Sequence, residues 1–138
     1  MADLKALMKR FNDEIMSQGK LEVIDELVSE DLVEHAAPPG VPANREGVRM
    51  FVQMFRDAFP DMKVTTIAVV VDGDEAWMHS SFTGTHKGEL MGIPPTNKKV
   101  EVTQFDRVKF KDGKAIEHWG LSDDMGMMTQ LGVAPEMG

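Results

Sequence analysis

The stretch from Asp112 to Gly132 holds the side chains best suited to acid–base chemistry. His118 and Trp119 lie on a predicted strand, and Asp123 follows where that strand gives way to a helix. A carboxylate beside an apolar strand loses contact with water, which raises its pKa and suits it to act as a general base near neutral pH. The sequence therefore makes Asp123 a candidate catalytic base, with His118 on the strand that precedes it.

Two opposing effects act on the predicted base. A helix N-terminus favours the Asp123 anion by about 0.3 to 1 kcal/mol at an exposed site, whereas burial can shift a carboxylate by several pKa units of about 1.4 kcal/mol each. If the side chain points inward, we expect burial to outweigh the helix terminus, so that the pKa of Asp123 is raised. The alternatives are that Asp123 only caps the helix and that His118 is a core histidine bonded to a backbone carbonyl.

The chain offers little for metal or cofactor chemistry. It has no cysteine, no His-Glu-x-x-His, no glycine fingerprint for nucleotides and no Gly-x-Ser-x-Gly. Its histidines are scattered, and none pairs with another at helical ligand spacing. We therefore predict no metal and no cofactor; a metal site assembled in space from His35, His86, His118 and Asp123 is the alternative.

Other side chains are predicted to hold a ligand. His35 precedes a proline-rich loop, and His86 precedes a loop rich in glycine and proline that can act as a lid, so we expect His86 near the pocket mouth. Gln104 and Asp106 are polar residues on an otherwise apolar strand face, where they either satisfy neighbouring groups or line a wet cavity. Trp119 is expected to form wall or core.

Composition restricts the class of protein. The chain has 138 residues, 42% of them hydrophobic, and a formal net charge of -8. This length suits a single domain spanning residues 1–138. The negative charge argues against nucleic acid and anionic membranes as partners. Because no apolar run reaches membrane length and the first ten residues lack a signal-peptide pattern, we expect a cytoplasmic protein.

Helices are expected to come first in the chain. Apolar residues at helical spacing predict a helix over residues 3–19, a shorter one over 21–28, and a third that Asn44 caps and Pro60 ends. Phe55, on the apolar stripe of the third helix, is predicted to contact the ligand.

Strands are expected to follow. The pattern changes to a period of two, with turns at Asp72-Gly73 and Asp112-Gly113. The predicted strands cover residues 62–71, 76–85, 100–110 and 115–121, after a short extended piece at 32–35 and before a helix that ends at Gly132. This order predicts an α+β domain with helices packed on one face of an antiparallel sheet.

Six short segments carry a family resemblance. They are Phe59-Pro60-Asp61, Gly84-Thr85-His86-Lys87-Gly88, Gly92-Ile93-Pro94-Pro95-Thr96, Asp112-Gly113-Lys114, Glu117-His118-Trp119-Gly120 and Gln130-Leu131-Gly132. In this order and spacing, residues 4 to 133 resemble the SnoaL-like polyketide (ester) cyclases. The resemblance implies the nuclear-transport-factor-2-like (cystatin-like) fold, in which N-terminal helices cover the concave face of a curled antiparallel sheet and enclose a hydrophobic pocket. It also implies a homodimer through the open side of the sheet.

The resemblance implies a reaction as well. Such enzymes close a ring by intramolecular aldol condensation without metal or cofactor, and the matching aspartate here is Asp123. We expect a small apolar carbonyl compound as ligand, with His118 orienting Asp123 or donating to the enolate and with His35, His86 and Gln104 holding carbonyl oxygens. The alternatives are an epoxide hydrolase or a ketosteroid-isomerase-like enzyme with the same carboxylate, and a non-catalytic carrier.

Overall fold

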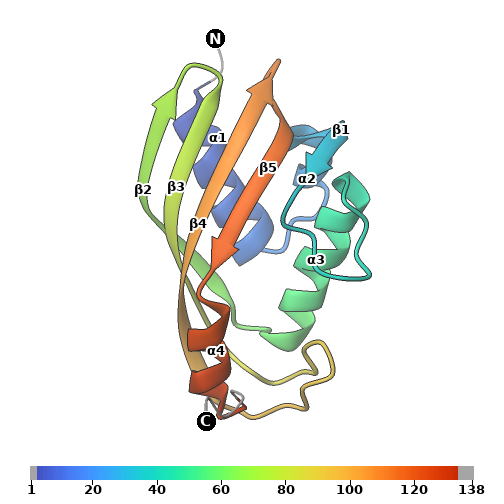
Figure 1. Ribbon diagram of the computed structural model, residues 1–138, viewed down its shortest axis with the longest axis vertical. Helices are drawn as coiled ribbons and strands as arrows, with labels where there is room; N and C mark the ends of the chain where they lie inside the picture. Colours follow the sequence, from blue (N-terminus) through green and yellow to red (C-terminus); the bar gives the residue numbers. More distant parts are fainter. Residues whose placement is uncertain (1–2, 134–138) are drawn as a thin grey trace.

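A curled sheet of five strands carries helices on one face (Figure 1). The computed structural model describes residues 3–133. The elements follow the chain as α1 (Leu4–Arg10), η1 (Phe11–Ser17), α2 (Val23–Leu27), β1 (Val28–Glu34), α3 (Arg45–Ala58), β2 (Lys63–Asp72), β3 (Glu75–Thr85), β4 (Lys99–Lys111), β5 (Lys114–Ser122) and α4 (Asp124–Leu131). Within these residues no helix is long and apolar enough to cross a membrane. The predicted α+β class is confirmed.

The strand order across the sheet is β1-β5-β4-β3-β2. Strands β2 to β5 form the expected antiparallel meander, but β1 runs parallel to β5 at the other edge. The sheet is therefore mixed, although an antiparallel sheet was expected. The extended piece predicted at residues 32–35 is the end of a longer strand, and pairing between segments more than eighty residues apart leaves no local pattern in the sequence.

The period of two places one face of each long strand against the helices. On β4 the buried side chains are Val100, Val102, Val108 and Phe110, and on β3 they include Ala76, Met78 and Phe82. Both strands belong to hairpins that turn at positive φ, and at the second hairpin Asp112 has φ 52° and Gly113 has φ 77°. The predicted face of β4 that carries Gln104 and Asp106 thus points toward the helices.

The first helix changes its winding halfway. Residues after Arg10 continue as the π-helix η1, where for example the N–H of Gln18 donates to the carbonyl of Asp13 at 3.2 Å. Gly19, at φ 73°, ends the segment as expected. A π-helical turn is wide and often occurs at functional sites. Here it places Asn12 against the inner face of the sheet.

Aromatic side chains fill the core between α3 and the sheet. The rings of Phe59 and Phe82 meet edge to face, with 5.2 Å between centroids, and both are buried. Gly84 leaves room for them, because a Cβ there would lie 3.0 Å from Cβ of Phe59. The nearby Asp61 accepts from the N–H and hydroxyl of Thr85, both at 2.7 Å, and these bonds lower its pKa. The segments Phe59–Asp61 and Gly84–His86 thus serve the fold.

Candidate active site

A cavity of about 630 Å³ lies between the inner face of the sheet and the helices. Most of its wall is methionine, phenylalanine and aliphatic side chains from α1, η1, α3, β4 and α4. The predicted ligand residues Phe55, Gln104 and His118 are part of this wall. The polar and charged side chains that line it are Asn12, Glu34, Gln104, Asp106, His118, Ser122 and Asp124.

The imidazole of His118 lies between two carboxylates. Its Nδ1 is 2.6 Å and 2.8 Å from the two oxygens of Glu34, and its Nε2 is 2.7 Å from Oδ1 of Asp106. Three strands contribute, because β1 supplies Glu34, β5 supplies His118 and β4 supplies Asp106. In the parallel register Glu34 stands directly beside His118, so the pairing of β1 with β5 assembles this cluster.

Gly120 makes room for the cluster. It is the register partner of Asp106, and a Cβ at this position would lie 2.9 Å from Asp106 Oδ1 and 3.1 Å from His118 Cε1. A side chain at residue 120 would therefore press on both members of the pair. The space needed by Asp106 and His118 thus explains why the segment Glu117–Gly120 ends in a glycine.

His118 is a cation at neutral pH. Burial alone would lower the pKa of its imidazole, but the hydrogen bonds to Asp106 and Glu34 outweigh that effect and raise the pKa to about 9. The protonated ring donates one N–H to each carboxylate, which leaves no N–H for a ligand. His118 thus positions the carboxylates, and its predicted direct bond to an enolate oxygen is not available in this arrangement.

Asp106 is the carboxylate best placed to exchange a proton with a ligand. Its Oδ1 accepts from His118, and no residue in the described range donates to its Oδ2. The side chain is 23% exposed and lines the cavity. A fixed carboxylate with one free oxygen in an apolar chamber can act as a general acid–base group.

Asp123 lies outside the cavity wall. Its carboxylate is exposed and accepts from the N–H of Gly126 at 2.9 Å, which makes it the N-cap of α4. The predicted burial of Asp123 is wrong, because the capping bond holds the side chain over the helix end instead of turning it inward. Its neighbour Asp124 lines the cavity instead.

The cap predicts a modest effect on stability. Replacing Asp123 with alanine should cost about 1 kcal/mol of unfolding free energy, because the N–H of Gly126 loses its acceptor. Asparagine, also a good cap, should cost much less. Urea unfolding of the two variants checks this expectation, and equal stability of Asp123→Ala and the wild type would contradict it.

His35 and Trp119 lie on the outer face of the sheet. Nε2 of His35 is 2.7 Å from a carboxylate oxygen of Glu117, and its ring stacks on Trp119 with 4.9 Å between centroids. The Arg107 guanidinium covers the same indole at 4.1 Å. Neither residue is among the cavity-lining residues in the described range. Alternation along the strand explains this, because Glu34 points inward and its neighbour His35 therefore points outward.

His86 is buried in the core and is not at a pocket mouth. It is 0% exposed, and its Nδ1 accepts from the N–H of Thr96 at 3.2 Å while the hydroxyl of Thr96 is 3.1 Å away. No described residue bonds its Nε2. The loop from His86 to Thr96 folds back on this ring, so the predicted lid position is wrong.

The four groups considered for a metal site do not meet. His35 pairs with Glu117, His86 with Thr96, His118 with two carboxylates, and Asp123 with a helix N-terminus. Over residues 3–133 no group of three or more histidine, cysteine and acidic side chains is placed to hold a metal ion. The alternative that combined these four residues is not assembled by the fold.

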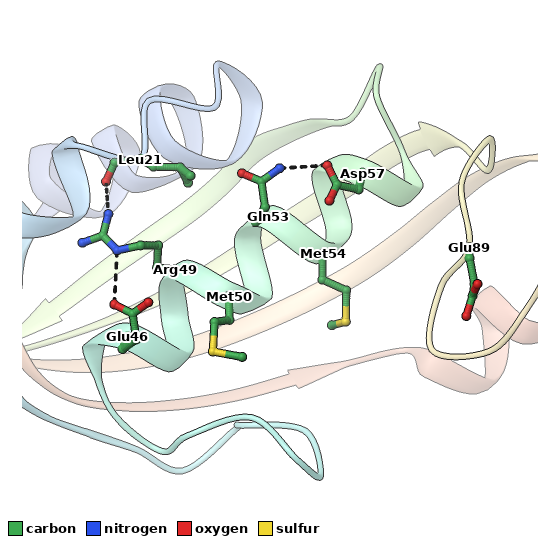
Figure 2. Close-up of a pocket in the computed structure, with 8 residues that line it drawn as sticks. All are labelled: Leu21, Glu46, Arg49, Met50, Gln53, Met54, Asp57 and Glu89. Atoms are coloured by element: carbon green, nitrogen blue, oxygen red, sulfur yellow. Dashed lines mark hydrogen bonds and ion pairs between the residues drawn. The ribbon is translucent and has the colours of Figure 1, made fainter.

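A second hollow, of about 570 Å³, lies on the outer side of α3 (Figure 2). Two of its polar side chains donate hydrogen bonds, Arg49 to the backbone carbonyl of Leu21 at 3.2 Å and Gln53 to the carboxylate of Asp57 at 2.8 Å. Figure 2 also shows the weaker contact of Arg49 with Glu46. None of the carboxylates that line this hollow, Glu46, Asp57 and Glu89, pairs with a histidine as Asp106 does, so the inner cavity is the better candidate site.

Known proteins are similar to this chain in sequence and in fold. The family model described as SnoaL-like polyketide cyclase matches residues 6–131. A curated relative, the nogalonic acid methyl ester cyclase of Streptomyces nogalater, is 24% identical over 116 residues, which cover 83% of this chain and 87% of that protein.

Solved structures agree with the family match. IdmH of Streptomyces antibioticus, a candidate polyketide cyclase, superposes with a TM-score of 0.83 at 35% identity over 96% of this chain and 100% of that one. TsrD of Streptomyces laurentii superposes with a TM-score of 0.87 at 26% identity over 96% of this chain and 99% of that one.

Proposed function

The chain belongs to the SnoaL-like polyketide cyclase family, and on this premise we propose that it closes a ring in a small apolar carbonyl compound by cofactor-free acid–base catalysis. The observation that carries the proposal is the carboxylate of Asp106, which lines an apolar cavity and is held by the protonated His118. An apolar wall rich in methionine adapts to hydrophobic ligands and keeps water away from the reacting atoms.

The chemistry needs one base that later acts as an acid. Asp106 takes a proton from a carbon flanked by carbonyl groups, which leaves an enolate. The enolate carbon then forms a bond to a second carbonyl carbon of the same molecule, whose oxygen becomes an alkoxide. That oxygen takes the proton back from Asp106, so an aldol ring forms and the carboxylate is regenerated.

His118 and Gln104 support this step in different ways. His118 fixes Asp106 through Nε2 and is itself fixed by Glu34 through Nδ1. Gln104 lies two residues before Asp106 on the same strand face and lines the cavity. Its amide N–H groups are proposed to hold a carbonyl oxygen of the ligand, where negative charge develops.

The direct test is proton exchange. In D₂O the wild-type protein should speed deuterium incorporation at the acidic carbon of the β-keto ester 2-carbomethoxy-1-tetralone, followed by nuclear magnetic resonance and compared with a buffer of the same pH. A protein that binds this compound, as measured by calorimetry, yet leaves its exchange rate at the buffer value would be a carrier, and the catalytic proposal would fail.

We also propose that two copies pair through the outer face of the sheet. Large apolar side chains are exposed there, with Val70 63%, Trp77 47% and Phe105 54% exposed. Such a patch on a sheet marks an interaction surface. The same face carries charges of both signs, including Arg107 and Glu117, and a mixed surface can pair with itself across a two-fold axis.

A charge at the centre of this face should separate the copies. Phe105→Glu is expected to give a monomer in light scattering, because burying a carboxylate in an apolar interface costs desolvation free energy. The matched control is Met50→Glu, which changes an exposed apolar residue of α3 and should leave the mass of the wild type. A wild-type protein that is already a monomer, or a Phe105→Glu variant that remains a dimer, would contradict the proposal.

A further inference from the structure

A row of polar side chains crosses the otherwise apolar inner face of the sheet. In register, Thr66 of β2 pairs with Ser80 of β3, Ser80 with Gln104 of β4, and Gln104 with Ser122 of β5. The neighbouring row in one direction is apolar and consists of Val64, Phe82 and Val102. The neighbouring row in the other direction holds Asp106. Polar groups on an inner face cost free energy unless they are bonded, so this row needs partners.

Asn12 of η1 satisfies one half of the row. Its Nδ2 lies 2.9 Å from Oγ1 of Thr66, 3.1 Å from Oγ of Ser80 and 3.2 Å from Sδ of Met78. A thioether sulfur can only accept a hydrogen bond, which assigns the nitrogen of the amide to this side. An amide nitrogen has two N–H bonds, so its donors are fully used.

The carboxamide oxygen of Asn12 is left over. No residue between 3 and 133 donates to its Oδ1. The residue is only 4% exposed, and it lines the cavity. Within the described residues the fully enclosed side-chain atom without a partner is Nε2 of His86, so Oδ1 of Asn12 is not sealed in the core but is open to the cavity. The π-helical turn therefore holds an unpaired acceptor against the chamber in which the ligand is proposed to lie.

The other half of the row is open to the cavity. The side chains of Gln104 and Ser122 line it, and within the described part of the chain neither has a side-chain hydrogen-bond partner. Gln104 is two residues from Asp106 on one strand face, which separates them by about 7 Å. Asn12 is thus bonded to the same row that carries Gln104, and this row lies one step along the sheet from the base.

We propose that Asn12 is a specificity-determining residue whose Oδ1 accepts a hydrogen bond from a hydroxyl group of the ligand. This inference rests on the proposed function, since it places the hydroxyl relative to the carbon that Asp106 deprotonates. The substrate class is then a carbonyl compound that also carries a hydroxyl group, set apart from the acidic carbon because Asn12 is bonded to the row next to that of Asp106. Because the side-chain nitrogen of Asn12 is already bonded, only its oxygen is available to the ligand. This oxygen can accept a hydrogen bond from a hydroxyl group, whereas an ether has no hydrogen to donate.

A ligand series tests this without turnover. By calorimetry, the wild type should bind 6-hydroxy-1-tetralone about tenfold more tightly than 1-tetralone, which corresponds to one hydrogen bond gained inside the cavity. The methyl ether, 6-methoxy-1-tetralone, can accept but not donate, and should bind no better than 1-tetralone. Equal affinities of the wild type for the hydroxyl compound and the parent ketone would overturn the proposal.

Variants locate the effect. The preference for the hydroxyl compound should disappear in Asn12→Leu and in Asn12→Ser, the second being included because it keeps a polar group beside Ser80 if leucine prevents folding. Thr103→Val, on the outer face of β4, should keep the preference. The assignment of Asn12 would be wrong if both folded variants still preferred the hydroxyl compound. If the leucine variant does not fold, a preference that persists in Asn12→Ser would have the same meaning.

The test of the hydroxyl preference is independent of the test of proton exchange. Asp106→Asn should retain the hydroxyl preference, because Asp106 belongs to the next row of the sheet. A protein that shows the preference but no proton exchange would keep the Asn12 assignment and lose the catalytic proposal. A protein that exchanges the proton but shows no preference for the hydroxyl compound would keep the catalytic proposal for Asp106 and lose the Asn12 assignment.

Discussion

The Asp106→Asn variant is expected to exchange the acidic proton of 2-carbomethoxy-1-tetralone about 100 to 10,000 times more slowly than the wild type. Asparagine has nearly the same shape and can still accept from Nε2 of His118, but it cannot take up a proton. The fold should therefore survive while the reaction is lost. Exchange rates from nuclear magnetic resonance and the circular dichroism spectrum measure the two properties on one sample.

Asp124 provides the matched control. It is a second carboxylate that lines the cavity, and it has no bond to His118. Asp124→Asn should exchange the proton at nearly the wild-type rate. If both variants lose the same fraction of activity, the negative field of the cavity would explain the rate and Asp106 would have no special position.

His118→Leu is expected to cost about 3 kcal/mol of unfolding free energy, because it leaves Glu34 and Asp106 close together without the cation between them. The proton-exchange rate should fall as well, since Asp106 loses the group that fixes it. Urea unfolding at neutral pH measures the stability. His35→Leu is the control, because His35 also pairs with a carboxylate but on the outer face of the sheet.

The stability of the wild type should fall at alkaline pH. The folded state raises the pKa of His118 from its ordinary value of 6.5 to about 9. A group with a raised pKa contributes its full stabilisation below pH 6.5, and loses it as the pH rises through 9. Unfolding free energies measured at points across this window should decline for the wild type. The decline should be smaller in His118→Leu, and an identical decline in both proteins would contradict the assignment.

The order of elements was predictable because it depends on local patterns. Helical spacing, the Asn44 cap and the Asp72-Gly73 and Asp112-Gly113 turns fix where elements begin and end. The sheet edge was not predictable in the same way. Val28 follows a helical apolar pattern and yet begins β1, because pairing with β5 overrides local preference. The direction of that pairing became evident only in three dimensions.

The candidate site was predictable in part for the same reason. The period of two marked Gln104 and Asp106 as polar residues on an apolar face, and both line the cavity. Glu34 was missed in favour of its neighbour His35, although the same alternation, counted from the buried Leu32, places Glu34 inward. His118 was predicted as a site residue, but its pairing with Glu34 could not be inferred, because the parallel pairing of their strands was not expected.

Asp123 illustrates the limit of reasoning from neighbours. Apolar residues surround it in sequence, which favoured burial, but a single bond to the N–H of Gly126 holds its carboxylate at the surface. His86 shows the opposite case. Its Gly/Pro-rich surroundings favoured exposure, whereas contacts with Thr96 and Phe59 bury it completely. In both cases specific contacts of the side chain decide its position, and the pattern of residues does not specify those contacts.

The identity of the base is tested most directly by measuring deuterium exchange into 2-carbomethoxy-1-tetralone with Asp106→Asn and Asp123→Asn side by side. Asp106 lines the cavity, and Asp123 caps α4 at the surface, where asparagine also serves as a cap. We predict that Asp123→Asn exchanges the proton at close to the wild-type rate and that Asp106→Asn falls to the rate in buffer. Loss of exchange in Asp123→Asn together with full activity of Asp106→Asn would contradict this assignment and return the catalytic role to Asp123.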